Sequence, residues 1–89
     1  MTVALRDGRR VDLELFVLAT CPWCLRVRWR LWRLGVQGVR LRDVGRDPAA
    51  AEELVRRGGQ DQVPCLFVDG APMYESGTIV AWLAANVER

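Results

Sequence analysis

The stretch LELFVLATCPWC, residues 13–24, decides the fold of this chain. Its first seven residues form a nearly continuous apolar run, and a run of that length before a chain breaker is typical of a buried central strand. Pro22 suits the first position of a helix, because its missing N–H needs no partner there. We expect this helix to run to about Leu34 and to end at Gly35. The sequence therefore predicts a strand followed at once by a helix, with Cys21 at the junction.

The interior of that helix has two competing patterns. Apolar residues and arginines alternate over residues 25–31, as in a strand, but the length of the segment and its Pro and Gly ends favour a helix. Arg28 falls within the apolar side, so its guanidinium must reach water or pair with an acid. We assign Trp29, Trp32 and Trp82 to the core. The predicted apolar side of the helix consists of Cys24, Leu25, Leu31, Trp32 and Gly35, and the opposite side of Arg26, Arg30 and Arg33.

Turn and cap residues predict the elements of the middle of the chain. Residues 39–44 alternate apolar and charged side chains, as a half-exposed strand does. Asp47 can cap a second helix, which Pro48 begins and Gly58-Gly59 ends. Residues 65–68 then form a short apolar strand.

A hairpin and a third helix complete the predicted order. Asp69-Gly70 is a two-residue hairpin turn that returns the chain through Met73-Tyr74, and Ser76 can cap the last helix. The order is β-α-β-α-β-β-α, and its first three elements form a right-handed βαβ unit. We interpret residues 1–89 as a single domain, with residues 1–11 as a short N-terminal extension.

The composition excludes several classes of protein. Half of the 89 residues (51%) are apolar, which argues against a disordered chain. No apolar run approaches the ~18 residues that span a membrane, and residues 1–18 contain acidic residues and no signal-peptide pattern. The net charge is +2, and the 13 basic residues are all arginine, which indicates a codon bias because no nucleic-acid-binding module accompanies them. We expect a cytoplasmic protein that binds neither nucleic acid nor membrane.

Three cysteines and no histidine carry the candidate chemistry. Cys21 and Cys24 form a C-x-x-C motif, which in a reducing compartment indicates redox chemistry or half of a metal site. A zinc site needs two further ligands, and Cys65 is the only other cysteine, so we expect no metal. We interpret Cys65 as a small buried residue, with a third redox thiol as the alternative.

The helix start gives Cys21 a chemical role. A helix N-terminus presents unpaired N–H groups and the positive end of the helix dipole, and both favour thiolate over thiol. The thiolate is the nucleophile of disulfide exchange, so Cys21 is the predicted attacking thiol. Cys24 follows one helical turn later on the same side and can resolve a mixed disulfide on Cys21. Pro22 stiffens the turn between them, and Trp23 offers a flat apolar surface beside it.

Three motifs, taken in order, resemble those of one protein family. They are Cys21-Pro22-Trp23-Cys24, then Gln62-Val63-Pro64-Cys65-Leu66, and then Met73-Tyr74-Glu75-Ser76-Gly77 with Ile79. Together they resemble the glutaredoxins, especially the small bacterial glutaredoxins close to the N-terminal domain of glutathione S-transferases. The resemblance covers about residues 13–88 and implies an α/β thioredoxin fold, in which helices flank a four-stranded mixed sheet.

The resemblance also implies roles for individual residues. Pro64 matches the family's cis-proline, and Val63 before it would offer its backbone N–H and C=O to an extended substrate. Ser76 and Gly77 would bind the γ-glutamyl carboxylate of glutathione through N–H groups at a helix start. The glutathione-binding residues implied in this way are Pro22, Trp23, Gln62, Val63, Pro64, Glu75, Ser76 and Gly77.

The chain departs from the family at two places. Ala19-Thr20 stands where glutaredoxins often carry a lysine, and Ser76-Gly77 stands where an acidic pair is common. Arg42 and Arg46 follow the second strand of the βαβ unit and are candidates to bind the glycyl carboxylate of glutathione.

The expected function is that of a monomeric enzyme that reduces protein disulfides or mixed disulfides with glutathione through Cys21 and Cys24. We expect no bound cofactor, with glutathione or an equivalent small thiol as co-substrate. One alternative is a module in which two chains hold an iron–sulfur cluster through Cys21 and two thiols. Another is a redoxin that a flavoprotein reductase reduces without glutathione, and a third is a docking domain with an idle C-x-x-C.

Overall fold

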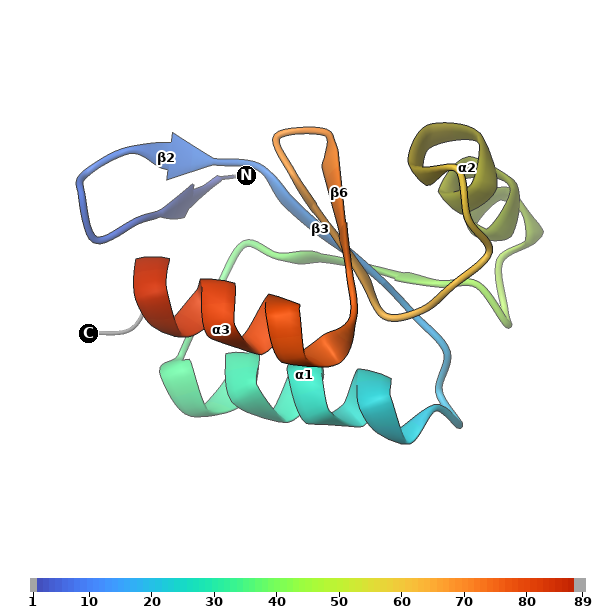
Figure 1. Ribbon diagram of the computed structural model, residues 1–89, viewed down its shortest axis with the longest axis horizontal. Helices are drawn as coiled ribbons and strands as arrows, with labels where there is room; N and C mark the ends of the chain where they lie inside the picture. The colour runs from blue at the N-terminus through green and yellow to red at the C-terminus, as the bar shows by residue number, and fades with distance from the viewer. Residues whose placement is uncertain (1, 88–89) are drawn as a thin grey trace.

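The computed structural model describes residues 2–87, and its centre is a four-stranded mixed sheet between two layers of helices (Figure 1). The strands lie in the order β4-β3-β5-β6; β3 is parallel to β4 and antiparallel to β5, and β5 is antiparallel to β6. The strands are β3 (Leu13–Val17), β4 (Arg40–Asp43), β5 (Cys65–Val68) and β6 (Ala71–Tyr74). The helices are α1 (Pro22–Leu34), α2 (Pro48–Gly58) and α3 (Ser76–Asn86). This is the predicted thioredoxin-like arrangement.

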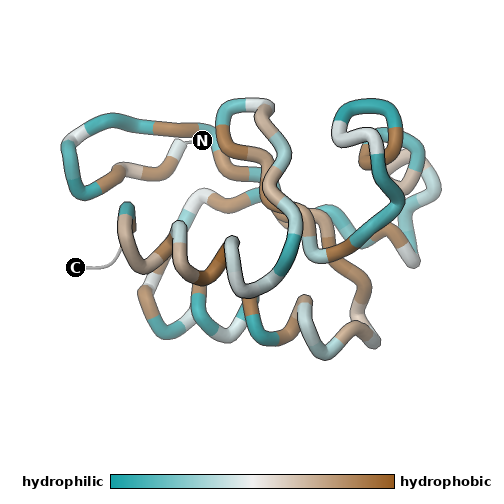
Figure 2. The backbone as a smooth tube through the Cα atoms, in the orientation of Figure 1, coloured by the Kyte–Doolittle hydropathy of each residue, from teal (hydrophilic) through white to brown (hydrophobic). Residues whose placement is uncertain are grey.

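The central strand β3 is buried along its whole length, because helices cover both faces of the sheet. Leu13, Leu15 and Val17 belong to the core cluster that α1 and α3 share, whereas Phe16 belongs to a second cluster against α2. Apart from Glu14, the residues of β3 are hydrophobic. In Figure 2 hydrophilic residues gather in the turn of the N-terminal hairpin and around α2, at the edges of the molecule. A strand buried on both faces needs apolar residues at consecutive positions, which is the pattern that predicted it.

The N-terminal extension forms a small hairpin on the main core. Its strands are β1 (Val3–Ala4) and β2 (Arg10–Val11), which pair antiparallel. Val3, Leu5 and Val11 are buried in the cluster of α1 and α3. The Arg6 N–H donates to the carbonyl of Asn86 at 2.7 Å, so the hairpin is also attached to the end of α3.

Most predicted helix ends and turns are confirmed. Pro22 and Pro48 stand at helix starts, and Gly35 and Gly59 have left-handed backbones at the helix ends. The Asp47 carboxylate accepts a hydrogen bond from the Ala49 N–H at 3.1 Å, as a capping residue does. The turn between β5 and β6 consists of Asp69 and Gly70, which both have positive φ, as a tight two-residue hairpin requires.

The predicted apolar side of α1 is partly wrong. Cys24, Val27 and Leu31 are its buried residues, whereas Leu25 is 51% exposed, Trp29 59% and Trp32 74%. Arg28 is exposed and does not lie on the buried side. The physical reason is that β3 and α3 cover only one side of α1, and alternating apolar residues place a second set on the opposite side. Of the tryptophans assigned to the core, only Trp82 packs against it, and it is half-buried.

One charged side chain, Glu14, lies inside the layer between the sheet and α2. It is 2% exposed, and its carboxylate accepts hydrogen bonds from Arg42 at 2.8 Å and Arg57 at 3.0 Å. The Arg42 guanidinium also donates a hydrogen bond to the Glu53 carboxylate at 2.9 Å. Burial raises the pKa of Glu14, but the hydrogen bonds from Arg42 and Arg57 outweigh it, so the net pKa lies below the ordinary value. The carboxylate is therefore ionised and connects β3, β4 and α2.

We predict that Glu14→Gln lowers the free energy of unfolding by roughly 1–3 kcal/mol at about pH 7, because hydrogen bonds to a charged group are lost. The folded pKa of Glu14 lies below its unfolded value of about 4.5. The contribution is therefore complete above that value and disappears as the pH falls through the folded pKa. Urea unfolding at a series of pH values should show the wild-type and variant stabilities converging in acid.

The matched control is Asp12→Asn, because Asp12 pairs with Arg40 at 2.8 Å on the surface with its side chain 42% exposed. An exposed pair contributes only about 0–1 kcal/mol. An equal loss of stability in the two variants would contradict a special role for the buried carboxylate.

Candidate functional site

The C-x-x-C cysteines lie where β3 has ended and α1 begins. Cys21 is the N-cap residue of α1, with extended backbone, and it is half-buried; Cys24 is fully buried beneath it. The Cys21 N–H donates to the Leu18 carbonyl at 3.0 Å, and the Cys21 carbonyl accepts from the Leu25 N–H at 3.1 Å. These bonds fix the turn that carries Cys21. Cys21 is partly accessible to solvent. It lies at a helix N-terminus, whose first N–H groups lack partners within the helix.

The two thiols have different surroundings. The Leu18 N–H donates to Sγ of Cys24 at 3.4 Å, and burial raises the pKa of the Cys24 thiol to about 11, to which the neighbouring Cys21 contributes. Cys24 therefore stays protonated at neutral pH. This difference suits Cys21 as the attacking thiol and Cys24 as the resolving thiol.

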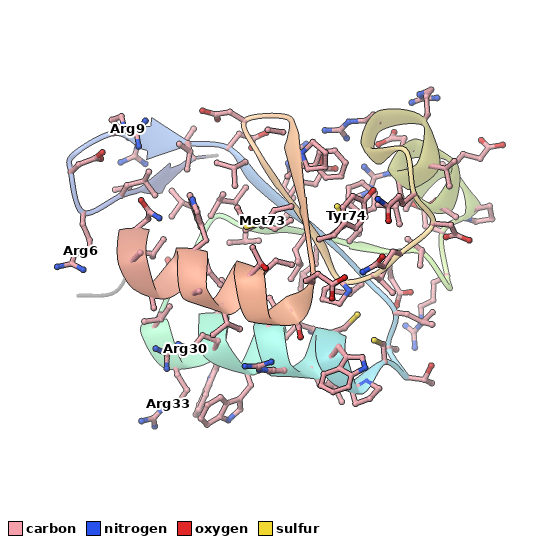
Figure 3. The ribbon with its side chains drawn as sticks, in the orientation of Figure 1. Arg6, Arg9, Arg30, Arg33, Met73 and Tyr74 are labelled. Atoms are coloured by element: carbon pink, nitrogen blue, oxygen red, sulfur yellow. The ribbon has the colours of Figure 1, made fainter. Side chains whose placement is uncertain are left out.

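The sheet register brings two other segments to the same end of the molecule. Phe16, near the end of β3, pairs with Cys65 at the start of β5, and Cys65 pairs with Tyr74 at the end of β6. The residues just before β5 and just after β6 therefore lie beside the start of α1. Met73 and Tyr74 lead into the start of α3, as Figure 3 shows.

A groove of about 640 Å³ lies at this end of the sheet. Seven of the eight residues implied to bind glutathione line it, and Pro22, which is exposed at the start of α1, does not. The Val63–Pro64 bond is cis, as predicted. The groove is lined by Trp23, Arg26, Gln62, Val63, Pro64, Glu75, Ser76, Gly77 and Thr78.

The start of α3 differs from the prediction. Glu75, not Ser76, is the N-cap residue, and its side chain makes no capping bond. Glu75 has φ 72°, a conformation that costs a residue with a Cβ on the order of 1–3 kcal/mol. Its carboxylate accepts a hydrogen bond from the Gln62 amide at 3.1 Å across the groove. This backbone turns the chain sharply from β6, and as a result Ser76 becomes the first residue of the helix.

Arg26 is a site residue that the sequence analysis missed, because it was assigned to the solvent side of α1. Its guanidinium lines the groove and donates to the Ser76 hydroxyl at 3.4 Å. A Cβ at Gly77 would lie 3.9 Å from Nη1 of Arg26, so the cation is close to the start of α3. The spacing from Trp23 was the available signal, since residues three apart share a helix face. Thr78 also lines the groove and was not predicted.

Neither arginine proposed for the glycyl carboxylate lies in the groove. Arg42 is held on the α2 side of the sheet by Glu14 and Glu53. Arg46 follows β4 with its side chain 86% exposed and lies 4.0 Å from Asp43. Both arginines lie outside the lining of the groove for the same reason: β4 is at the edge of the sheet opposite β6, and the groove lies on the β6 side.

Cys65 is buried on the opposite face of the sheet from Cys24. It packs in the cluster of Phe16, Leu54 and Phe67 against α2, whereas Cys24 packs in the cluster of α1 and α3. Burial raises the pKa of the Cys65 thiol. This environment is that of a small core residue, the first of its two interpretations.

Two classes of feature do not occur in residues 2–87. No helix there is long and apolar enough to cross a membrane. In the same part of the chain, no three His, Cys, Asp or Glu side chains lie close enough together to share a metal ion.

Comparison with known families identifies this arrangement. Residues 13–72 match the family model described as Glutaredoxin, which is more than half of the chain. The chain belongs to the glutaredoxin family. It is 33% identical over 63 residues to a probable glutaredoxin of Synechocystis sp., a match that covers 71% of this chain and 58% of the relative. It is also 33% identical over 58 residues to glutaredoxin 3 of Escherichia coli, covering 65% and 69% respectively.

Solved structures show the same fold. A glutathione transferase Omega 3C from Trametes versicolor matches with a TM-score of 0.72 at 23% identity, over 83% of this chain and 33% of that one. The holo form of glutaredoxin C1 from poplar matches with a TM-score of 0.64 at 20% identity, over 79% and 71%. The fold therefore occurs both as most of a glutaredoxin and as about a third of a transferase.

We predict that iodoacetamide at about pH 8 modifies Cys21 well before Cys24 and Cys65. Cys24 is buried, and a thiol with a pKa of about 11 is ionised in roughly one molecule in a thousand at that pH. Peptide mass spectrometry after short labelling should place the adduct on Cys21. Labelling in denaturant serves as the control, where all three cysteines should react. An early adduct on Cys24 in the folded protein would contradict the assigned order.

Proposed function

We propose that this glutaredoxin-family chain is a thiol–disulfide oxidoreductase in which Cys21 attacks and Cys24 resolves. The observation that carries the proposal is the pair itself: a solvent-accessible N-cap cysteine above a buried cysteine one helical turn later. A helix N-terminus favours the anionic form of a cysteine and positions it for attack. Family membership supports the same chemistry.

The reaction proceeds in two exchanges. The Cys21 thiolate attacks one sulfur of the substrate disulfide and forms a mixed disulfide, and the other sulfur leaves as a thiolate that takes a proton from water. Cys24 then attacks Sγ of Cys21, its proton passing to the departing substrate sulfur, and leaves a Cys21–Cys24 disulfide and a reduced substrate. Two thiols of an external reductant return the pair to the dithiol and are themselves oxidised to a disulfide.

Burial of Cys24 keeps the two steps in order. A thiol that is protonated and covered does not compete with Cys21 for the incoming disulfide. Once the mixed disulfide has formed, the same cysteine is one turn from the sulfur that it must attack. This arrangement reserves Cys24 for resolution.

We propose glutathione as the reductant, bound in the groove beside Cys21. The first N–H groups of α3, at Ser76 and Gly77, suit a carboxylate, because a helix N-terminus binds anions. Arg26 adds a cation at the same place, next to the Ser76 hydroxyl. The backbone of Val63, before cis-Pro64, would pair with the extended tripeptide as an added strand does. We propose that the protein acts in this way as a cytoplasmic monomer without a bound cofactor.

We predict that Cys21→Ser abolishes disulfide exchange, whereas Cys24→Ser accumulates a mixed disulfide on Cys21. The first variant lacks the nucleophile and the second lacks the group that releases the product. Non-reducing mass spectrometry after reaction with a disulfide-bonded protein should detect the trapped adduct only in Cys24→Ser. Cys65→Ala is the control and should retain turnover. An active Cys21→Ser together with an inactive Cys24→Ser would reverse the roles.

We predict that Arg26→Gln raises the KM for glutathione roughly tenfold, since a hydrogen bond to a charged group contributes about 1.5–3 kcal/mol and this site is partly open to water. Turnover with dithiothreitol as the reductant should be unchanged. Gly77→Asp should have a larger effect, because its carboxylate would lie beside Arg26 and repel that of glutathione.

Arg46→Gln and Gly77→Ala are the matched controls for the glutathione site. Arg46 is exposed outside the groove, and alanine at residue 77 adds no charge. Equal KM values for glutathione in Arg26→Gln, Gly77→Asp and the wild type would contradict binding of glutathione in this groove. Turnover with thioredoxin reductase but not with glutathione and its reductase would then favour the reductase-coupled alternative.

A further inference from the structure

The outer side of α1 carries a second apolar face, separate from the one buried in the core. Four of the six exposed large apolar side chains among residues 2–87 belong to this helix. Three of them, Leu25, Trp29 and Trp32, are spaced i, i+4 and i+7 and therefore form one stripe along the helix. Single exposed apolar residues are ordinary on a protein surface, but a continuous row of large ones indicates a binding surface.

The stripe leads into a hollow at the C-terminal end of α1. Trp32 lines a cavity of about 250 Å³ together with four apolar residues and one arginine, namely Leu31, Val36, Val39, Leu41 and Arg28. Leu41 is 51% exposed and belongs to β4, the edge strand of the sheet. The surface is therefore concave at this end and can accept an apolar side chain from a partner.

Positive charge borders the stripe on both sides. Arg28 and Arg33 are exposed, and the ion pairs among residues 2–87 involve neither of them. The guanidinium of Arg33 stacks over the Trp29 ring at 5.6 Å and projects away from the sheet (Figure 3). The helix contains no acidic residue that could neutralise this charge.

We propose that Leu25, Trp29 and Trp32 are the docking stripe for an amphipathic helix of a partner protein, one whose apolar residues are bordered by Glu or Asp. Apolar residues at i, i+4 and i+7 are the row that one helix presents to another, and Arg28 and Arg33 complement acidic borders. A second copy of this chain is disfavoured, because a twofold contact would oppose arginine to arginine. A lipid surface has no side chain to fill the hollow beside Trp32. The proposal is independent of the thiol chemistry.

The test uses two synthetic helical peptides with leucines at i, i+4 and i+7, bordered by glutamates in one and by lysines in the other. We expect the full chain to bind the glutamate peptide and to show a blue shift of tryptophan emission, as exposed indoles leave water. Binding should weaken at least tenfold in the double variant Trp29→Ala, Trp32→Ala. It should weaken similarly in Arg28→Glu, Arg33→Glu, which should bind the lysine peptide instead.

The control is Val55→Ala, which removes an exposed apolar side chain from α2 and should bind like the wild type. All variants should keep the far-UV circular dichroism spectrum and the urea unfolding midpoint of the wild type, which shows that they are folded by a measurement that does not depend on the proposed function. The proposal is overturned if wild type binds neither peptide or both equally, or if the stripe variants bind unchanged. Tighter binding to phosphatidylcholine–phosphatidylglycerol vesicles, or self-association that requires Trp29 and Trp32, would also overturn it.

Discussion

Burial of β3 on both faces is the constraint on which the rest of this structure depends. All five of its residues are excluded from water, so helices must cover both sides of the sheet. On one side, Leu13, Leu15 and Val17 require the layer of α1 and α3. On the other side, Phe16 requires α2, and the N-terminal hairpin closes the end of the first layer.

Glu14 adds an ionic requirement to the burial of β3, because its carboxylate is buried with the rest of the strand. A buried carboxylate is strongly unfavourable unless charged hydrogen-bond donors surround it. Arg42 from β4 and Arg57 from α2 supply these donors, and their guanidiniums also stack over the rings of Phe16 and Phe67 at 5.4 Å and 4.5 Å. The ionic contact thus ties the position of α2 to the register of β3 and β4. The same contact holds the Arg42 guanidinium on the α2 side of the sheet, outside the lining of the groove.

The candidate site follows from the directions of the strands. The chain leaves β3, enters β5 and leaves β6 at one end of the sheet, where α1 and α3 both begin. Two helix starts and a cis-proline loop therefore meet around Cys21, and each helix start contributes unpaired N–H groups. Three parts of α1 therefore have three different surroundings: its start carries Cys21 and Cys24, its inner side packs in the core, and its outer side carries the stripe of Leu25, Trp29 and Trp32.

The sequence by itself determined the element order from residue 13 onward, the ends of α1 and α2, and the position of Cys21 at a helix start, but not the N-terminal hairpin or the cap of α3. These are local properties, set by consecutive apolar residues, by Pro22 and Pro48, and by glycines at left-handed positions. The three-motif resemblance also located seven residues of the groove. Only the tertiary structure decided which side of α1 is buried, because both of its sides carry large apolar residues and the position of α3 selects one. It likewise decided that Arg26, and neither Arg42 nor Arg46, faces the groove, since that depends on which sheet edge each residue reaches and which carboxylates already hold it.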